Sequence, residues 1–460
     1  MSLDGKPSTE AVAVGSGSAR QSIAANGTGD SVVVPKRWRK LAAVAAPLWS
    51  DNNEVSVLST LAPVIISALS LPVSAIGLLV SVSKAIGIFF GPLWSVIARR
   101  TNRKWVLVIS TSLVGVATAA TGLAQNFVQL LLLWSIAAVF VAAALPIVTE
   151  ITADLFDEKS RGRANGYTWG VVSLLGSALG PLIGQLSLIP DGWRIGFFAS
   201  GAIGLVVAVG IIIGFQDPGV GASEPALRGR TIEQQAEDSK LTRAKVQSLL
   251  KIPTFLLMLG QRLLAGHLLI ATFGVLFLVE TYGFTTAVAS VVTLPFGIGY
   301  LLGTFAGGML TDLLHAKNPR RGRIVVLQVA QFGVAAAALL GTQINWRHIG
   351  IFAVLWALMG FMQGINPGVN RPIVMAVVPP ELRGAAFALM LSVFEALAYI
   401  AFNLSAGYLS AAVSLQTVML WLPGILMTIN GLYCTVLYRT YPRDVDRLDA
   451  LLKNRTAASE

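Results

Sequence analysis

Long stretches of apolar residues dominate this chain of 460 residues. A helix needs about 20 consecutive, mostly apolar residues to cross the hydrocarbon core of a bilayer. The stretches are too long and too uniformly apolar for the short alternating strands of a transmembrane β-barrel. The sequence therefore predicts an all-α polytopic membrane protein with twelve transmembrane helices. The predicted spans are 42–68, 74–97, 105–124, 127–153, 164–188, 195–215, 252–281, 286–312, 323–343, 349–377, 384–411 and 415–438.

The composition agrees with this class, because 54% of the residues are hydrophobic and only 12% are charged. A soluble domain carries about 25% charged residues. A single cysteine, Cys434, excludes a disulfide framework, and three histidines leave little room for a His-rich metal centre. The chain also lacks the G-x-x-x-x-G-K-[ST] motif of ATP-hydrolysing proteins. We therefore expect no metal, no cofactor and no ATP hydrolysis.

The basic residues predict the orientation of the chain. Most of the 34 lysines and arginines lie before the first span, after the last one, or in the loops that follow even-numbered spans. Arg194 and Arg347 are the exceptions in the loops of the other side. Cytoplasmic loops carry the excess of Lys and Arg, so both termini and the central loop are predicted to be cytoplasmic. The net charge of +11 is then a signal of topology, and nucleic acid is not expected as a partner.

Six spans precede a polar stretch and six follow it. The second half repeats features of the first: Arg161-Gly162-Arg163-Ala164 opens the fifth span and Arg383-Gly384-Ala385-Ala386 opens the eleventh. The chain is therefore predicted to hold two six-helix pseudo-repeats. The predicted parts are a disordered cytosolic tail (1–40), an N-terminal bundle (41–215), a cytosolic linker (216–251), a C-terminal bundle (252–438) and a second cytosolic tail (439–460).

Three motifs resemble those of the major facilitator superfamily, over nearly the whole chain from Leu41 to Tyr438. Gly308-Met309-Leu310-Thr311-Asp312 matches the first half of the family's G-x-L-x-D-R-x-G-R-R/K loop motif. A degenerate first copy, in which Arg99 replaces the acidic residue, runs from Ser95 to Lys104. The fifth span carries Gly176, Gly180, Pro181 and Gly184, which resemble the family's antiporter motif. The resemblance implies a monomeric secondary transporter that works by alternating access, in the bacterial inner (plasma) membrane.

A narrower resemblance is to the spinster-like transporters of lysolipids and sphingolipids. Their first helix carries N-Y-x-D-R, and Asn52-Asn53-Glu54-Val55 falls in this register with Glu54 in the place of the acidic residue. Val55 replaces the family's arginine. In the fourth span, Trp134 and Val141 stand where the spinster-like helix has an arginine and a glutamate. The resemblance implies a lipid-like substrate.

Ionisable residues inside a membrane span cost about 2.5–3.5 kcal/mol on insertion scales, and they mark functional sites. Glu54 lies near the middle of the first span and His267 lies at a similar depth in the seventh. We expect these two side chains to face each other between the repeats, where such transporters bind their ions and substrates. Asp51 is a second carboxylate of this group, and its alternative role is to pair with Arg262. The predicted proton-coupling residues are Glu54, Asp51 and His267.

A second set of polar residues is predicted to contact the substrate. Arg262 can grip an anionic group with two hydrogen bonds. Lys84 and Glu395 lie midway through the second and eleventh spans, and we expect them to form an ion pair between the halves. Three amides of the tenth span are polar enough to line a cavity. The predicted substrate-binding residues are Arg262, Lys84, Glu395, Gln363, Asn366 and Asn370.

Charged residues near the cytoplasmic ends of the spans predict a gate that closes in the outward-facing state. The predicted gating residues are Arg103, Glu150, Asp154, Arg161, Asp312, Arg371 and Arg383.

Two further functions remain open beside a proton-coupled transporter of a small or amphiphilic solute, such as a lysolipid-like anion. A proton-driven multidrug efflux antiporter would bind cations through Glu54, Asp51 or Glu395. A membrane receptor or sensor without transport is the alternative of a different class. An enzyme is not expected, because His267 and Glu54 alone do not make a metal or nucleophile site. The expected partners are the substrate, protons and membrane lipids.

Overall fold

The computed structural model describes residues 34–156, 158–219 and 242–457, and these residues are helical apart from short turns. Within the first half of the chain (residues 37–214), α1 begins at Arg37, inside the stretch predicted as a tail. The helices of this half are α1 (Arg37–Thr60), α2 (Ala62–Ala68), α3 (Ser74–Arg100), α4 (Arg103–Thr121), α5 (Phe127–Val141), α6 (Ala144–Leu155), α7 (Glu158–Gln185), η1 (Leu186–Leu188) and α8 (Gly192–Gly214).

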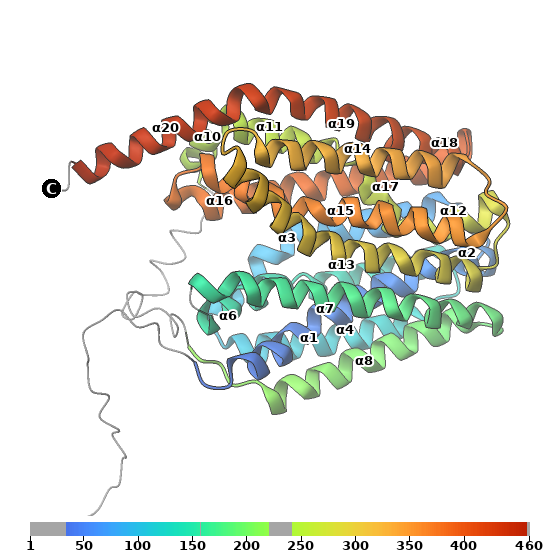
Figure 1. Cartoon of the computed structure of the whole chain (residues 1–460). Helices are drawn as coiled ribbons and strands as arrows, with labels where there is room; N and C mark the ends of the chain where they lie inside the picture. The colour runs from blue at the N-terminus through green and yellow to red at the C-terminus, as the bar shows by residue number, and fades with distance from the viewer. Residues whose placement is uncertain (1–33, 157, 220–241, 458–460) are drawn as a thin grey trace, which may run out of the picture. The chain divides into compact units, whose positions relative to one another are not determined.

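The second half (residues 243–457) is more interrupted. Its helices are α10 (Arg243–Leu250), α11 (Pro253–Leu263), η3 (Gly266–Leu269), α12 (Ile270–Tyr282), α13 (Thr286–Lys317), α14 (Gly322–Gln343), α15 (Ile349–Val377), η4 (Pro380–Leu382), α16 (Arg383–Phe387), η5 (Ala388–Phe394), α17 (Glu395–Ala412), α18 (Leu415–Met419), η6 (Leu420–Leu426), α19 (Met427–Tyr433), η7 (Cys434–Val436) and α20 (Leu437–Ala457). Figure 1 shows α20 extending past the ends of its neighbours.

Eleven helical segments among the described residues are long and apolar enough to cross a membrane. They match the second to twelfth predicted spans. The first predicted span corresponds to α1 and α2, and its polar run from Ser50 to Glu54 lowers its hydropathy. The prediction of an all-helical polytopic membrane protein is confirmed. The last helix is longer than predicted, because α20 continues to Ala457.

Two spans of the second half are irregular where charged residues lie. The seventh predicted span is divided into α11, η3 and α12, and the first break follows Leu263, the residue after Arg262. In the eleventh span, the wide π-helical turns of η5 end directly before Glu395. Irregular backbone at membrane depth is tolerated where it is buried in protein or lines a water-filled cavity, and single π-turns are frequent at functional sites.

Each half has its own hydrophobic core. Two clusters draw their buried residues from Val34–Phe215, and two others draw theirs from Leu249–Tyr441. Tyr399 packs against a cluster of each half, which makes it one of the side chains that join them. Burial of apolar side chains within each half explains why six helices can hold together as a unit.

The two halves meet most extensively through α3 with α17 and α7 with α13, and less extensively through α12 with α1 and α2. Figure 1 shows α7 running beside α13. A Cβ atom on Gly77 of α3 would collide with the backbone carbonyl of Asn403 on α17, and one on Gly184 of α7 would collide with Ser290 of α13. We call the end of the helices with Arg100, Arg103 and Arg383 the basic end. These close contacts lie toward the opposite end.

At the basic end each half packs on itself. The most extensive contacts of α4 and α6 are with other helices of the first half, and those of α11 and α16 are with helices of the second half. The described chain is therefore joined at the end opposite the basic end.

Candidate functional site

An ion pair within the second half forms the centre of the candidate site. Arg262, at the end of α11, places its Nε 3.6 Å from Oε2 of Glu395, at the start of α17. The Arg262 side chain is 8% exposed and that of Glu395 is 33% exposed. The distance is within range for an ion pair but too long for a hydrogen bond, and neither atom has a hydrogen-bond partner among the described residues. The alternative in which Arg262 pairs with Asp51 is not what the structure shows, because the ion-pair partner of Arg262 is Glu395.

Tyr300 of α13 and Arg371 of α15 complete this cluster. Both interact electrostatically with Arg262 and with Glu395. Arg371 is exposed on the helix surface, although it lies within a predicted membrane span. Charged side chains within membrane spans almost always face the bundle interior or a water-filled cavity rather than lipid. The sequence placed Arg371 in the gate, whereas the structure groups it with the two predicted substrate-binding residues.

Lys84 of α3 approaches the same region from the first half. Its Nζ lies 5.0 Å from the centre of the Tyr399 ring on α17, a cation–π contact. The hydroxyl of Tyr399 is in turn 3.3 Å from Oγ1 of Thr272 on α12. Lys84 thus contacts α17, as predicted, but it contacts Tyr399 rather than Glu395. Glu395 pairs with Arg262 instead. Glu395 and Tyr399 are one helical turn apart.

Asp51 and Glu54 form a buried acidic pair on α1. They are three residues apart and so share one face of the helix. Glu54 is 3% exposed, and its Oε2 has no hydrogen-bond partner in the described part of the chain. No ion pair among the described residues includes either carboxylate. The neighbouring Asn53 donates a hydrogen bond to Oγ of Ser200 on α8 at 3.0 Å, which fixes this stretch of α1.

The sequence suggested that His267 faces Glu54, but the structure places the His267 ring against another residue. Its ring Nδ1 lies 3.3 Å from the sulfur of Met427, at the start of α19. The residue is 2% exposed and packs inside the second half. This position makes His267 a packing residue in this conformation rather than the partner of a carboxylate across the halves.

The three predicted amides of α15 lie inside the second bundle. Asn366 accepts a hydrogen bond from Nε2 of Gln331 on α14 at 2.7 Å, and it donates one to the backbone carbonyl of Gln363 at 3.1 Å. Asn370 is 1% exposed, and both polar atoms of its amide lack a partner among the described residues. Gln331 was not predicted. Its position in a long apolar segment was the signal that could have identified it.

A second cluster of charges lies at the basic end and joins helices of the first half to Asp217, which follows α8. Arg103, at the start of α4, binds Asp154 of α6 at 2.5 Å and binds both carboxylate oxygens of Asp217, at 2.5 and 3.0 Å. Beside it, Arg99 of α3 binds Glu150 of α6 at 2.7 Å. Asp217 was not predicted, although an acidic residue directly after the sixth span was a signal for it.

Two other predicted gating residues, Arg383 and Asp312, do not join this cluster. Arg383 donates hydrogen bonds to the carbonyls of Met375 and Val378, so it caps the end of α15. Asp312 is exposed on α13, and no ion pair within the described ranges includes it. The side chain of Arg161 lies outside the described residues.

The antiporter-like residues differ from one another in their surroundings. A Cβ atom on Gly176 or Gly180 would meet nothing within 4 Å in the described parts of other elements, so these two glycines make no close helix contact there. Gly184 does allow such a contact, with Ser290 of α13. Pro181 lies within α7, which continues to Gln185.

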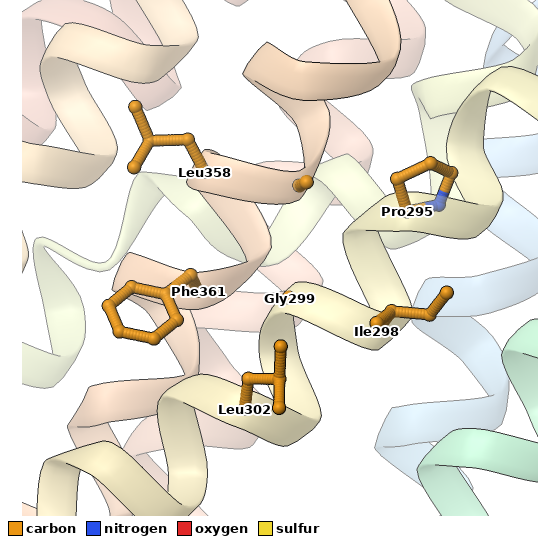
Figure 2. A pocket seen from close by; sticks show the side chains of 7 residues that line it. Pro295, Ile298, Gly299, Leu302, Leu358 and Phe361 are labelled. Carbon is orange, nitrogen blue, oxygen red and sulfur yellow. The ribbon is translucent and has the colours of Figure 1, made fainter.

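A purely apolar hollow of about 310 Å³ lies between α13 and α15. Figure 2 shows its lining, which includes Pro295, Ile298 and Leu302 of α13 and Leu358 and Phe361 of α15. Ile298, Leu302 and Leu358 are exposed. The hollow offers no polar side chain to orient a ligand, so it does not add to the candidate site.

Comparisons with known proteins agree with the fold. A family model described as the Major Facilitator Superfamily matches residues 52–344 and 254–458. The chain is 27% identical to the uncharacterized MFS-type transporter YtbD of Bacillus subtilis (strain 168), over 77% of this chain and 85% of that protein. It is 28% identical to the hexuronate transporter of the same strain, over 62% of this chain and 67% of that protein.

Among solved structures, a bacterial homologue of the human lysosomal transporter Spinster is similar in fold. It was crystallised in an inward-facing and unoccupied conformation. The TM-score is 0.73 at 22% sequence identity, covering 89% of this chain and 98% of that chain. At this identity the likeness concerns the fold alone.

Proposed function

Because this chain belongs to the Major Facilitator Superfamily, as a secondary transporter of small solutes and not an enzyme, we propose that it carries an amphiphilic organic anion by alternating access. The observation that carries the proposal is the excess of positive charge in the candidate site. Arg262 pairs with the carboxylate of Glu395, Arg371 interacts electrostatically with it, and Lys84 lies over the ring of Tyr399, one helical turn along α17. A guanidinium binds carboxylate and phosphate groups in a bidentate geometry.

The apolar surroundings favour a ligand with an apolar part. Arg262 lies at the end of α11, whose buried residues Met258 and Leu259 belong to a hydrophobic core. Tyr399 packs against the hydrophobic clusters of both halves. A lysolipid-like anion combines a single charged group with an apolar chain, and this is the substrate class we propose.

We further propose that Glu54, with Asp51 beside it, carries the coupled proton. Glu54 is buried and Oε2 of its carboxylate has no partner among the described residues. A charged group at such depth is costly without a partner, which favours uptake of a proton when the cavity closes. The basic end would then face the cytoplasm, as the positive-inside rule requires. In that orientation the conformation is open inward, because the halves join at the other end.

The substrate class is tested by a thermal-shift panel on the purified protein. Lysophosphatidate should raise the apparent stability of the wild type, by about 2.7 kcal/mol at a ligand concentration 100 times Kd. The shift should be lost in Arg262→Ala and kept in Arg443→Ala, which removes an exposed arginine of α20. Stabilisation that is equal in Arg262→Ala and the wild type would contradict a role of Arg262 in anion binding.

Efflux of cationic compounds is the second candidate, because the acidic pair Asp51 and Glu54 has no cation partner among the described residues. Stabilisation by cationic drugs, but not by lysophosphatidate, in both the wild type and Arg262→Ala would favour it. Binding of a ligand without flux in liposomes would instead favour a sensor.

Proton coupling is tested by flux in proteoliposomes under an imposed pH gradient. Glu54→Gln should abolish accumulation against a concentration gradient while leaving the protein folded. Glu280→Gln, at an exposed carboxylate near the end of α12, is the matched control and should behave as the wild type. Accumulation by Glu54→Gln at the wild-type level would remove Glu54 from the coupling mechanism.

A further inference from the structure

We propose that the carboxylate of Glu395 occupies the anion-binding site while no substrate is bound, as an internal stand-in for the substrate. When an anion binds, it displaces this carboxylate from Arg262, and the carboxylate then pairs with Lys84. The inference rests on the proposed transport of an organic anion. It assigns to Glu395 two successive cation partners, one in each half of the protein. The exchange would couple binding of the substrate to closure of the basic end.

The first support is the loose geometry of the Arg262–Glu395 pair. Nε of Arg262 and Oε2 of Glu395 are 3.6 Å apart, and neither atom makes a hydrogen bond among the described residues. Charge-assisted hydrogen bonds between guanidinium and carboxylate groups are about 2.7–2.9 Å long when well formed. A carboxylate or phosphate of a substrate can therefore form shorter contacts with Arg262 than Glu395 does.

The second support is the position of Lys84. Glu395 and Tyr399 are four residues apart on α17, so their side chains share one face of that helix. Nζ of Lys84 lies over the Tyr399 ring at 5.0 Å. The ammonium group is thus held one helical turn from Glu395, and Lys84 has no carboxylate partner among the described residues. Lys84 is therefore a cation of the first half that a carboxylate displaced from Arg262 by a bound anion can pair with.

The third support is the mechanical setting of the two residues. The α3 and α17 helices are in backbone contact at Gly77 and Asn403. Lys84 and Glu395 lie seven and eight residues from that contact, on its basic-end side, which corresponds to about 10–12 Å along a helix. The π-helical turns of η5 directly precede Glu395 and give this segment room to shift. An ion pair formed there would draw α3 and α17 together toward the basic end.

Binding affinities test the stand-in role. In Glu395→Gln the competing carboxylate is gone, so lysophosphatidate should bind about tenfold more tightly if the stand-in occupies the site nine-tenths of the time. Transport should nevertheless be slower than in the wild type, because the exchange cannot occur. Monoacylglycerol with the same acyl chain, which lacks the charge, should show no change in affinity, and Glu280→Gln should bind both ligands as the wild type does.

An unchanged or weaker affinity of Glu395→Gln for lysophosphatidate would overturn the stand-in role, while leaving the anion-transport proposal intact if the wild type still binds this ligand. Failure of the wild type to bind any organic anion would instead overturn the proposed function. The second partner of Glu395 is tested separately, without any ligand.

A double variant, Lys84→Glu with Glu395→Lys, exchanges the two charges and gives this second test. The new lysine is repelled by Arg262, so it should pair with the new glutamate on α3 and close the basic end. Spin labels at Arg100→Cys and Lys317→Cys, which replace exposed residues of the two halves at this end, report the distance. We expect a shorter distance in the double variant than in the wild type without ligand. The same distance distribution in both proteins would overturn the transfer to Lys84.

Discussion

The contact of α3 with α17 at Gly77 gives the sharpest prediction about how the two halves move. A Cβ atom at this position would collide with the carbonyl oxygen of Asn403, and it would lie 3.1 Å from the carbonyl carbon of that residue and 3.4 Å from Cα of Gly407. These are backbone atoms of a helix, which cannot rotate away as a side chain can. The substitution Gly77→Ala therefore requires α3 and α17 to separate by about 1 Å to restore carbon contacts of 3.5–4.0 Å.

The energetic cost falls on the conformation in which these helices touch. Overpacking by an added carbon costs about 1–3 kcal/mol, and that range corresponds to a change of about 5- to 150-fold in an equilibrium between two conformations. Gly77→Ala should therefore favour the conformation that is open at the end opposite the basic end. Gly87→Ala is the matched control on the same helix, because a Cβ atom there meets nothing within 4 Å in the described parts of other elements.

Distances between spin labels measure this shift. Leu188→Cys and Val413→Cys place labels at exposed positions of the first and second halves near the end opposite the basic end. The natural Cys434 is buried and should not react with the label. In Gly77→Ala we expect a population at longer distance that is absent or minor in the wild type and in Gly87→Ala. Identical distributions in all three proteins would refute the argument that this contact holds the two halves together.

Three substitutions test the packing of the described helices by denaturant or thermal unfolding in detergent. Arg103→Ala should lower the free energy of unfolding by about 3–5 kcal/mol, because it removes the buried guanidinium that binds both Asp154 and Asp217; a loss below 1 kcal/mol would contradict the burial of that cluster. Asp444→Ala removes the carboxylate that accepts a 2.8 Å hydrogen bond from the backbone N–H of Thr254 at the start of α11, and it should cost about 0.5–2 kcal/mol. The exposed Asp449 of the same helix is its control, and equal effects of the two alanine variants would refute the capping role. Gly283→Ala should cost about 1–2 kcal/mol because Gly283 has a φ of 70°; unchanged stability would show that the turn relaxes.

The spans were predictable because their signal is local. Length and hydropathy alone gave the segments of α3 to α8 and of α11 to α17, since a helix of the required length must be apolar around most of its circumference in lipid. The charged positions within them were also predictable, because a Lys, Arg or Glu in such a segment is conspicuous.

The partners of those residues were not predictable, because they depend on the rotation and depth of helices far apart in the sequence. Arg103 binds Asp217, which lies 114 residues away, and His267 contacts Met427, which lies 160 residues away. The sequence placed Lys84 beside α17 correctly, but a difference of one helical turn decides between Tyr399 and Glu395. Gly184 allows a close contact and Gly180 does not, although both belong to the same motif, because only one faces α13.

The central claim is that this transporter moves an organic anion through a site that contains Arg262. Counterflow in proteoliposomes tests it most directly, because exchange of labelled for unlabelled substrate needs neither an ion gradient nor its coupling. Liposomes loaded with unlabelled lysophosphatidate should take up the labelled compound when they contain the wild type, with little uptake for Arg262→Ala and none for monoacylglycerol. Uptake no faster than in protein-free liposomes, or equal uptake with Arg262→Ala, would contradict the claim.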